Sequence, residues 1–201
     1  MSKLKLGILG GGLNSVAGYT HFVASQMDGK FEVVSGMFSR NKEINRNTAK
    51  YWNIKNYYDN LDDFIKNEKG KLDAVSVLLP TPYHYEVVKK LPENNFFVIC
   101  EKPLLSTFEE VKKIEKFYKP NKHYLVVTYN YIAYPILGYL KKLIKEGYLG
   151  KLLHIHLEMP QGSFLRPPKN IDYPPFWRKK DGKIPGILLD LASHLESILF
   201  F

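Results

Sequence analysis

Apolar runs of strand length alternate with segments of helical spacing over the first 130 residues, and this alternation constrains the fold more than any other feature. The apolar runs predict buried strands at 4–9, 31–38, 73–79, 96–100 and 124–128. The spacing of apolar residues predicts helices at 13–27, 42–51 and 83–91, and a capping-box pattern, Thr107 with Glu110, opens a further helix. Such alternation implies right-handed crossovers. We therefore predict an α/β protein whose first domain, residues 1–130, is a doubly wound parallel sheet.

The pattern changes after Asn130. The spacing predicts an amphipathic helix over 135–146, a strand over 151–158, a loop rich in proline and aromatic residues over 159–185, and an apolar helix over 186–201. A small sheet needs about three strands or a packed helix to be stable. We therefore expect residues 131–201 to be the start of a second α/β domain that is incomplete because the chain is truncated at its C-terminus.

Composition indicates an ordinary globular protein. Of the 201 residues, 45% are hydrophobic, so a packed core is expected. The single cysteine, Cys100, excludes an intrachain disulfide, fits a reducing compartment and reads as a buried strand residue rather than a nucleophile. No apolar run approaches the roughly 20 residues that span a bilayer, and no signal region precedes the first strand. These features predict a cytoplasmic protein without a membrane partner.

The net charge of +9 raises the possibility of nucleic-acid binding. The lysines, however, are scattered over predicted helix faces and do not form a stripe interleaved with stacking aromatic residues. A solvated basic surface explains them better, and such a field also attracts an anionic cofactor or substrate. We expect no nucleic-acid partner.

A glycine-rich turn follows the first predicted strand. The segment Gly10-Gly11-Gly12-Leu13-Asn14-Ser15 matches the dinucleotide-binding pattern except at its last position, where serine replaces glycine or alanine. Gly10 permits the tight turn, Gly12 lets the backbone approach a pyrophosphate at the helix N-terminus, and Ser15 is small enough to keep helix and strand close. The first domain is therefore predicted to be a Rossmann domain whose cofactor-binding residues include Gly10, Gly12, Leu13, Asn14 and Ser15.

Ser39 and Arg40 stand near the end of the second strand, where an acidic residue would accept the ribose hydroxyls of NAD. A carboxylate repels a 2′-phosphate, whereas a guanidinium and a hydroxyl bind one. We predict that NADP is preferred and that NAD is possible. A solvated loop arginine is the competing interpretation of the same residues.

Two further segments follow predicted strands. Leu79 and Thr81 are expected to line the cofactor between its phosphates and the nicotinamide, with His84 beside them or capping its own helix. Lys102, in the sequence Glu101-Lys102-Pro103, follows the apolar run 96–100. A lysine on the sheet edge that carries the dinucleotide turn lies where this fold binds its ligands. Together these features indicate a nicotinamide-dependent oxidoreductase.

An ordered set of motifs runs through the chain. The set comprises the glycine turn, Thr81-Pro82 with His84, Glu101-Lys102-Pro103, Tyr129-Asn130 with Tyr134-Pro135, Gly147 with Gly150-Lys151, and Asp190 with His194. In this order it resembles the family of glucose–fructose oxidoreductase, inositol dehydrogenase and MocA, over essentially the whole chain. The resemblance implies a Rossmann domain followed by an α/β domain whose open sheet covers the substrate and forms homo-oligomers when complete.

The resemblance also implies site residues. Lys102 and His194 would be the catalytic pair, with Asp190 as a further catalytic residue and substrate contact, and the Lys102-Pro103 bond would often be cis and aim the lysine. The remaining residues expected to bind the cofactor are Glu101, Lys102 and Asn130, and those expected to bind the substrate are Tyr129, Trp177 and Arg178. Relatives continue well beyond the helix that carries His194.

The residues agree with those roles. Asp190 and His194 are four apart, so on a helix they would share one face. In alcohol oxidation His194 would take the hydroxyl proton, and Lys102 would steady the developing alkoxide. A helix-surface pair is the equally open alternative for Asp190 and His194. A two-residue spacing separates His154, His156 and Glu158, as it separates side chains on one face of a strand. This is not a recognised spacing of zinc ligands, so no metal site is expected.

We therefore expect an NAD(P)-dependent dehydrogenase that acts on CH–OH groups of a sugar, cyclitol or related polyol. The alternative is a non-catalytic truncated fragment or a nucleotide-binding pseudoenzyme. A basic nucleic-acid-binding module ranks last.

Overall fold

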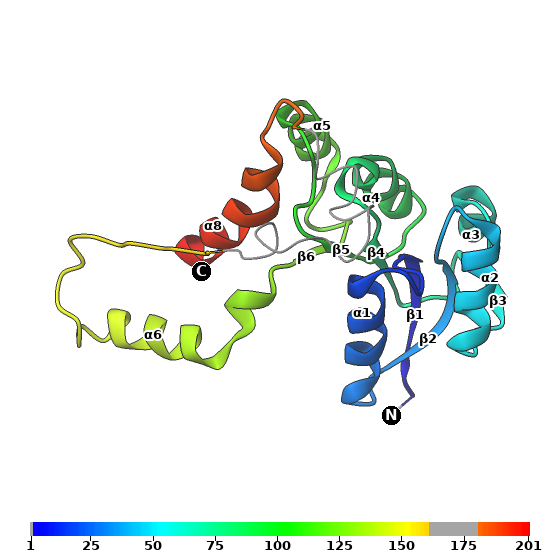
Figure 1. Cartoon of the computed structure of the whole chain (residues 1–201), viewed down its shortest axis with the longest axis horizontal. Helices are drawn as coiled ribbons and strands as arrows, with labels where there is room; N and C mark the ends of the chain where they lie inside the picture. Colours follow the sequence, from blue (N-terminus) through cyan, green and yellow to red (C-terminus); the bar gives the residue numbers. More distant parts are fainter. Residues whose placement is uncertain (1, 161–180) are drawn as a thin grey trace. The chain divides into compact units, whose positions relative to one another are not determined.

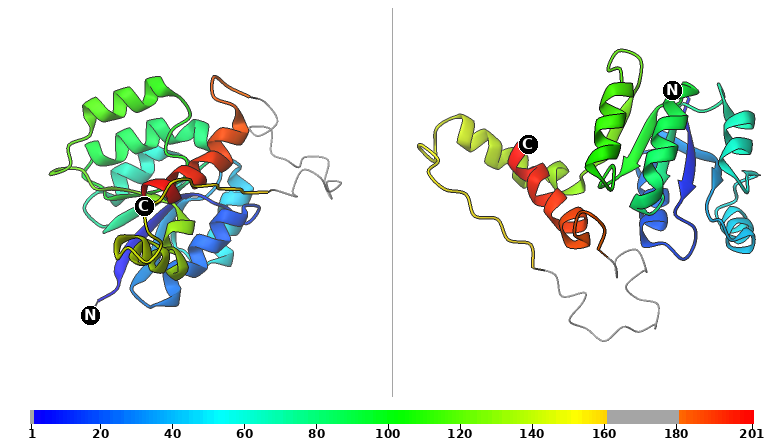
Figure 2. Two further views of the ribbon diagram at one scale, coloured as in Figure 1. Left: turned by 90° about the vertical axis from the view of Figure 1, so that its left-hand side faces the viewer. Right: turned by 90° about the horizontal axis from the view of Figure 1, so that it is seen from above.

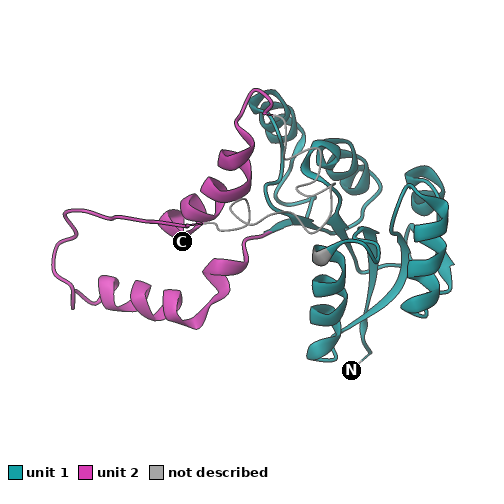
Figure 3. Cartoon of the chain, in the orientation of Figure 1, with its two compact units in different colours: residues 1–127 teal, residues 128–201 magenta. Residues whose placement is uncertain are grey.

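The computed structural model describes residues 2–160 and 181–201. The chain divides into two compact units, residues 1–127 and residues 128–201 (Figure 3), and each unit is described by itself. The expected domain boundary after residue 130 stays a prediction.

The first unit alternates strands and helices along the sequence (Figure 1). Its elements are β1 (Leu4–Gly10), α1 (Val16–Met27), β2 (Phe31–Met37), α2 (Lys42–Tyr51), β3 (Asn56–Tyr57), α3 (Leu61–Glu68), β4 (Ala74–Leu78), the 3₁₀ turn η1 (Thr81–Tyr83), α4 (His84–Glu93), β5 (Val98–Glu101), α5 (Phe108–Phe117) and β6 (Leu125–Thr128). The strand order is β3-β2-β1-β4-β5-β6, which is the order of dinucleotide-binding folds. The predicted doubly wound sheet is confirmed.

The strands pair in parallel where β1 meets β2 and β4, where β2 meets β3, and where β4 meets β5. Neighbouring residues of a strand point to opposite faces, so each face of the sheet has its own core. Leu9 and Val77 belong to a cluster that includes residues of α3, α4 and α5, whereas Ile8 and Leu78 belong to one that includes residues of α2 with Phe22 of α1 packed against it. Helices therefore cover both faces (Figures 1 and 2).

The sequence interpretation missed β3 and α3. β3 has only two residues, too few to show alternation, and α3 has eight. Phe64 is the only apolar side chain of α3 that is completely buried. The apolar spacing typical of a helix therefore cannot be recognised in this segment of the sequence. The helix is fixed at its start by Asn60, whose side chain accepts a hydrogen bond from the Asp63 amide.

Side chains cap α1, α2 and α5 in the same way. Ser15 begins α1 and Asn41 begins α2, each accepting backbone N–H groups of the first turn. Thr107 and Glu110 form the predicted capping box at the start of α5, because the Thr107 hydroxyl accepts the Glu110 amide and the Glu110 carboxylate accepts the Thr107 amide. These bonds satisfy amides that have no partner within the helix.

The turn between β1 and α1 depends on close backbone contacts. Gly10 has φ of +84°, and a Cβ there would lie 2.8 Å from the carbonyl carbon of Leu78 on β4. A Cβ on Gly18, in α1, would overlap the carbonyl oxygen of Gly11. The close approach of helix and turn expected at Ser15 is therefore made by Gly18, and Ser15 instead caps the helix. The role of Ser15 in cofactor binding stays a prediction.

The second unit is helical in its described residues. It contains the 3₁₀ turn η2 (Asn130–Ala133), α6 (Pro135–Lys145), the π-helical turn η3 (Leu188–Ala192) and α8 (Ser193–Phe200). Residues 151–158, expected to be a strand, pair with no strand in the part of the chain that the structure describes. Alternating side chains favour a strand only when another strand offers its backbone, and none of the described residues of this unit does so.

Helix α6 has an unburied apolar stripe. The structure describes no buried residue in this helix, and Ile136, Tyr139, Leu140 and Ile144 expose 66%, 57%, 41% and 37% of their surfaces. Their spacing places them on one face, as in a helix that packs against a partner. Elsewhere in the described chain, no helix is long and apolar enough to cross a bilayer, and α6 is not either.

Gly18→Ala should destabilise the first unit by at least about 2 kcal/mol, because the new methyl group must displace the Gly11 carbonyl. The matched control is Gly138→Ala in α6, where a Cβ meets nothing within 4 Å. Helix propensity alone makes alanine better than glycine by about 1 kcal/mol there. Denaturation followed by circular dichroism measures both changes, and an unaffected Gly18→Ala variant would refute the close contact.

The apolar stripe of α6 should bind a hydrophobic fluorescent dye, because the residues that the structure describes leave it exposed. We expect the double substitution Leu140→Gln and Ile144→Gln to remove much of the dye signal. Met27→Gln in α1 is the control, since Met27 is 81% exposed and lies outside the stripe. Equal dye binding by wild type and the double variant would show that the stripe is not the binding surface.

Candidate active site

The predicted cofactor residues of the first unit gather at one edge of its sheet. Because the strands are parallel, the ends of β1, β2, β4 and β5 face the same way. The turn 10–15, Ser39 with Arg40, the segment 79–84, and Glu101 with Lys102 each stand at or directly after one of these ends. Ligands of this fold bind at this edge, where the strand order reverses between β1 and β4.

The glycine turn is held by its own amides. The N–H of Gly12 donates to the Phe38 carbonyl at 3.1 Å, and the N–H of Leu13 donates to Thr48 Oγ1 at 3.1 Å. Gly12 is buried between the end of β2 and α2, where a Cβ would meet Ile44 at 3.1 Å. The absence of a side chain at Gly12 therefore permits this close packing, in addition to any approach of a ligand to the backbone. In this fold the first turn of such a helix, whose leading amides have no partner within the helix, is where an anion would bind.

Arg40 meets Tyr83 across the edge of the sheet. The Arg40 guanidinium lies 4.3 Å from the centre of the Tyr83 ring, a cation–π contact between the segment after β2 and the 3₁₀ turn after β4. Ser39 Oγ accepts the Asn41 amide at 3.1 Å. Both Arg40 and Tyr83 remain exposed, so the guanidinium is oriented without being withdrawn from solvent. Sequence reasoning missed Tyr83, although Thr81-Pro82 directly before it marked the segment.

The loop that carries Ser39 and Arg40 is anchored by a buried amide. Asn45 Oδ1 accepts the Phe38 N–H at 2.8 Å, and its Nδ2 donates to the Tyr58 carbonyl at 2.8 Å and to Asp59 Oδ1 at 3.1 Å. A buried polar side chain needs such partners, and here they are largely backbone groups of two loops. Asn45 therefore fixes the end of β2 from the protein interior.

His84 connects two backbone segments at the edge of the sheet. Its ring is completely buried, with Nε2 2.6 Å from the Leu79 carbonyl and Nδ1 3.0 Å from the Pro103 carbonyl. The ring does not cap α4, which begins without a side-chain cap, so that alternative was wrong. Because both nitrogens face backbone carbonyls, His84 ties the segment after β4 to the segment after Lys102. Thr81, three residues earlier, is also buried.

Lys102 follows β5 directly. Its backbone N–H donates to Glu101 Oε2 at 3.2 Å, and Glu101 Oε1 lies 2.7 Å from His21 Nε2. The Lys102-Pro103 peptide is cis, as the resemblance implied. Lys102 is partly exposed at the sheet edge. Cys100, just before, is buried, and burial raises the pKa of its thiol, so it suits a core position and not a nucleophile.

The other catalytic candidates belong to the second unit. His194 is buried in α8, and the edge of the Tyr131 ring meets it at a centroid distance of 4.7 Å, with Tyr129 at 6.4 Å. Asp190 lies in the π-helical turn that leads into α8. The shared helical face expected for Asp190 and His194 assumed an α-helical period. A π turn has a wider period, and it is a frequent feature of functional sites.

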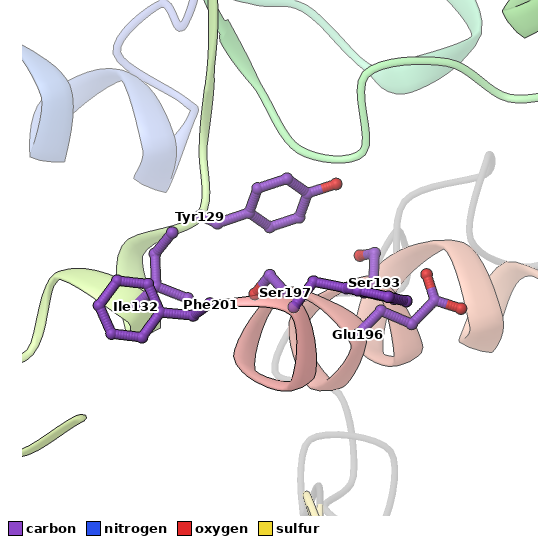
Figure 4. Close-up of a pocket in the computed structure, with 7 residues that line it drawn as sticks. Tyr129, Ile132, Ser193, Glu196, Ser197 and Phe201 are labelled. Carbon is purple, nitrogen blue, oxygen red and sulfur yellow. The ribbon is translucent and has the colours of Figure 1, made fainter. Parts of the chain in front are cut away.

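A cavity of about 450 Å³ opens within the second unit (Figure 4). Tyr129 and Ile132 lie on one side of it, and Ser193, Glu196 and Ser197 of α8 on the other. Burial, and then the negative charge of Glu196, raise the pKa of the Tyr129 hydroxyl above its usual value. The shift extends the pH range over which this phenol keeps its proton. Asn130 is exposed beside Tyr129 at the start of η2.

Trp177 and Arg178 lie outside the described residues, so their expected substrate contacts remain predictions. Lys102 belongs to the first unit, and Asp190 and His194 belong to the second.

In the described chain, no group of three or more histidine, cysteine or acidic residues is arranged to hold a metal ion. His156 instead meets Glu158, with Nε2 2.8 Å from Oε1 on an exposed segment.

Comparison with known proteins agrees with this geometry. The levoglucosan dehydrogenase of Pseudarthrobacter phenanthrenivorans is 26% identical over 201 residues, which are 97% of this chain and 50% of that protein. The scyllo-inositol 2-dehydrogenase (NADP+) IolW of Bacillus subtilis is 26% identical over 195 residues, again 97% of this chain and 50% of the relative. The chain thus spans about half the length of the curated relatives it matches.

A solved structure shares the fold. The inositol dehydrogenase homologue of Azotobacter vinelandii, in complex with NAD+, aligns with a TM-score of 0.70 and 27% identity, covering 75% of this chain and 40% of that one. A model of the GFO/IDH/MocA oxidoreductases, described as a family with an NAD-binding Rossmann fold, matches residues 4–129. That match covers more than half of the sequence, and the protein therefore belongs to the GFO/IDH/MocA family of NAD(P)-binding oxidoreductases.

Proposed function

We propose that this chain carries the cofactor-binding half and the catalytic lysine of a dehydrogenase acting on a sugar, cyclitol or related polyol. The observation that carries the proposal is the position of Lys102. It follows β5 at the sheet edge that also holds the glycine turn and the first turn of α1. Names of relatives support the substrate class, since they include a levoglucosan and a scyllo-inositol dehydrogenase.

The residues at this edge fit a dinucleotide. The backbone of the turn can pack this tightly only because Gly10 and Gly18 lack a Cβ, and the first turn of α1 is left to face a pyrophosphate. When bound, the nicotinamide supplies or accepts the hydride. Glu101 and Lys102, at the end of β5, stand on the side of the switch point away from β2, which is where the nicotinamide half of such a ligand belongs.

The roles of the side chains follow from their charge and chemistry. The Lys102 ammonium would stabilise the negative charge that develops on the substrate oxygen during oxidation. His194 would take the hydroxyl proton, and Asp190 would hydrogen-bond a neighbouring hydroxyl. The Tyr129 phenol, which lines the cavity, would add a donor to the substrate. Completion of the C-terminal sheet by further chain would cover the substrate and support a homo-oligomer.

We propose further that NADP is preferred over NAD. A stacked arginine presents its N–H groups in a fixed orientation, which suits the recognition of a phosphate. Arg40 is held in this way over Tyr83, and the loop that carries it is anchored by Asn45. In this fold the adenosine ribose of a dinucleotide lies at the end of the second strand, which supports a contact between the Arg40 guanidinium and a 2′-phosphate.

Titration of the two reduced cofactors tests this preference. NADPH should bind at least as tightly as NADH, and Arg40→Asp should weaken NADPH by at least about tenfold, or about 1.4 kcal/mol. Arg46→Asp is the matched control, because Arg46 is exposed in α2 and its replacement changes the net charge equally. Equal affinities that Arg40→Asp leaves unchanged would rule out the preference for NADP.

Turnover of a panel of sugars and cyclitols tests the role of Lys102. In a form that turns over, Lys102→Met should lower kcat/KM by about a hundredfold or more, equal to about 2.7 kcal/mol of barrier, with the melting temperature nearly unchanged. The exposed Lys112 of α5, changed to Met, is the control. Full activity of Lys102→Met would assign the chemistry to other residues.

A further inference from the structure

We propose that His21 is a positioning residue that holds Glu101, and through Glu101 the Lys102 backbone, against helix α1. The cofactor-binding helix and the catalytic loop would then be placed by one contact. This inference rests on the proposed function in that it assigns the coupled parts to the two ends of a dinucleotide. The contact itself is a property of the structure.

The contact reaches across the sheet. His21 lies in the second turn of α1, after the cap at Ser15, and α1 connects β1 to β2. Its partner Glu101 ends β5, which stands two strands from β1 because β4 lies between them. Neighbouring strands are about 5 Å apart, so the pair joins elements roughly 10 Å apart along the sheet edge. The strand between them is the one at which the strand order reverses.

The pair is well placed to restrict motion. His21 Nε2 and Glu101 Oε1 are 2.7 Å apart, and the two side chains expose only 23% and 24% of their surfaces. A hydrogen bond to a carboxylate is stronger when it is partly shielded from water. The second oxygen of the same carboxylate accepts the Lys102 N–H at 3.2 Å. The Glu101 carboxylate therefore links a side chain of α1 to the backbone of the catalytic lysine.

Helix α1 has a separate anchor, which makes the role of His21 testable. Gly18 packs directly on the Gly11 carbonyl, and this contact fixes the helix to the turn after β1. Loss of the His21 side chain should therefore leave α1 in place and release only the Glu101–Lys102 segment. A purely structural histidine would instead loosen the helix and the loop together.

Hydrogen exchange of backbone amides in the ligand-free chain is the first test. His21→Ala should speed exchange at Lys102 by about tenfold or more, while amides of α1 and β4 keep their protection. His21→Gln, which retains a donor, should restore part of the protection. Gln26→Ala, an exposed change in the same helix, is the control. Unchanged exchange at Lys102 in His21→Ala would overturn the proposal.

Ligand affinity is the second test. His21→Ala should weaken NADPH by about fivefold or more and leave adenosine 2′,5′-bisphosphate unchanged, because that ligand lacks the nicotinamide half. Equal weakening of both ligands would mean that His21 supports α1 itself, which contradicts the proposal. Failure of the wild-type chain to bind either NADPH or NADH would refute the proposed function, and the exchange experiment would still decide the role of His21.

Discussion

The contact between α1 and the turn before it governs the arrangement of the candidate site. Gly18 lies so close to the Gly11 carbonyl that no other residue fits. This approach sets the direction in which the first turn of α1 points and brings His21 within reach of Glu101 at the end of β5. The first turn of α1 and the end of β5 are thus connected through one helix, which packs this closely because Gly18 lacks a side chain.

Buried polar side chains then fix the loops at the sheet edge. Asn45, Thr48 and His84 are all fully buried, and each bonds to backbone groups of a neighbouring loop. A buried polar group without a partner is costly, so these bonds restrict the loops to one arrangement. Arg40 is exposed and Lys102 is partly exposed, and the buried side chains fix the loops that carry them. This division suits a binding site, because the frame is rigid and the groups that meet the ligand stay exposed.

The described residues of the second unit include the candidate catalytic residues Asp190 and His194, but they form no sheet of their own. His194 is buried beside Tyr131, and the cavity lined by Tyr129 and Glu196 lies within this unit. The apolar stripe of α6 is left exposed by the described part of the chain. Relatives are about twice as long, and they belong to a family of oxidoreductases.

The sequence by itself determined the doubly wound sheet, most helix boundaries, the cap at Thr107 and the location of Lys102 at the end of β5. Those features depend on local periodicity and on capping residues close in the chain. Tertiary structure alone decided the contacts of Gly18, His84 and His21 and the stacking of Arg40 on Tyr83. It also decided that residues 151–158 pair with no strand among the described residues, because a strand needs a partner. Each of these depends on a group distant in sequence, and local pattern carries no information about which distant backbone or side chain will lie alongside.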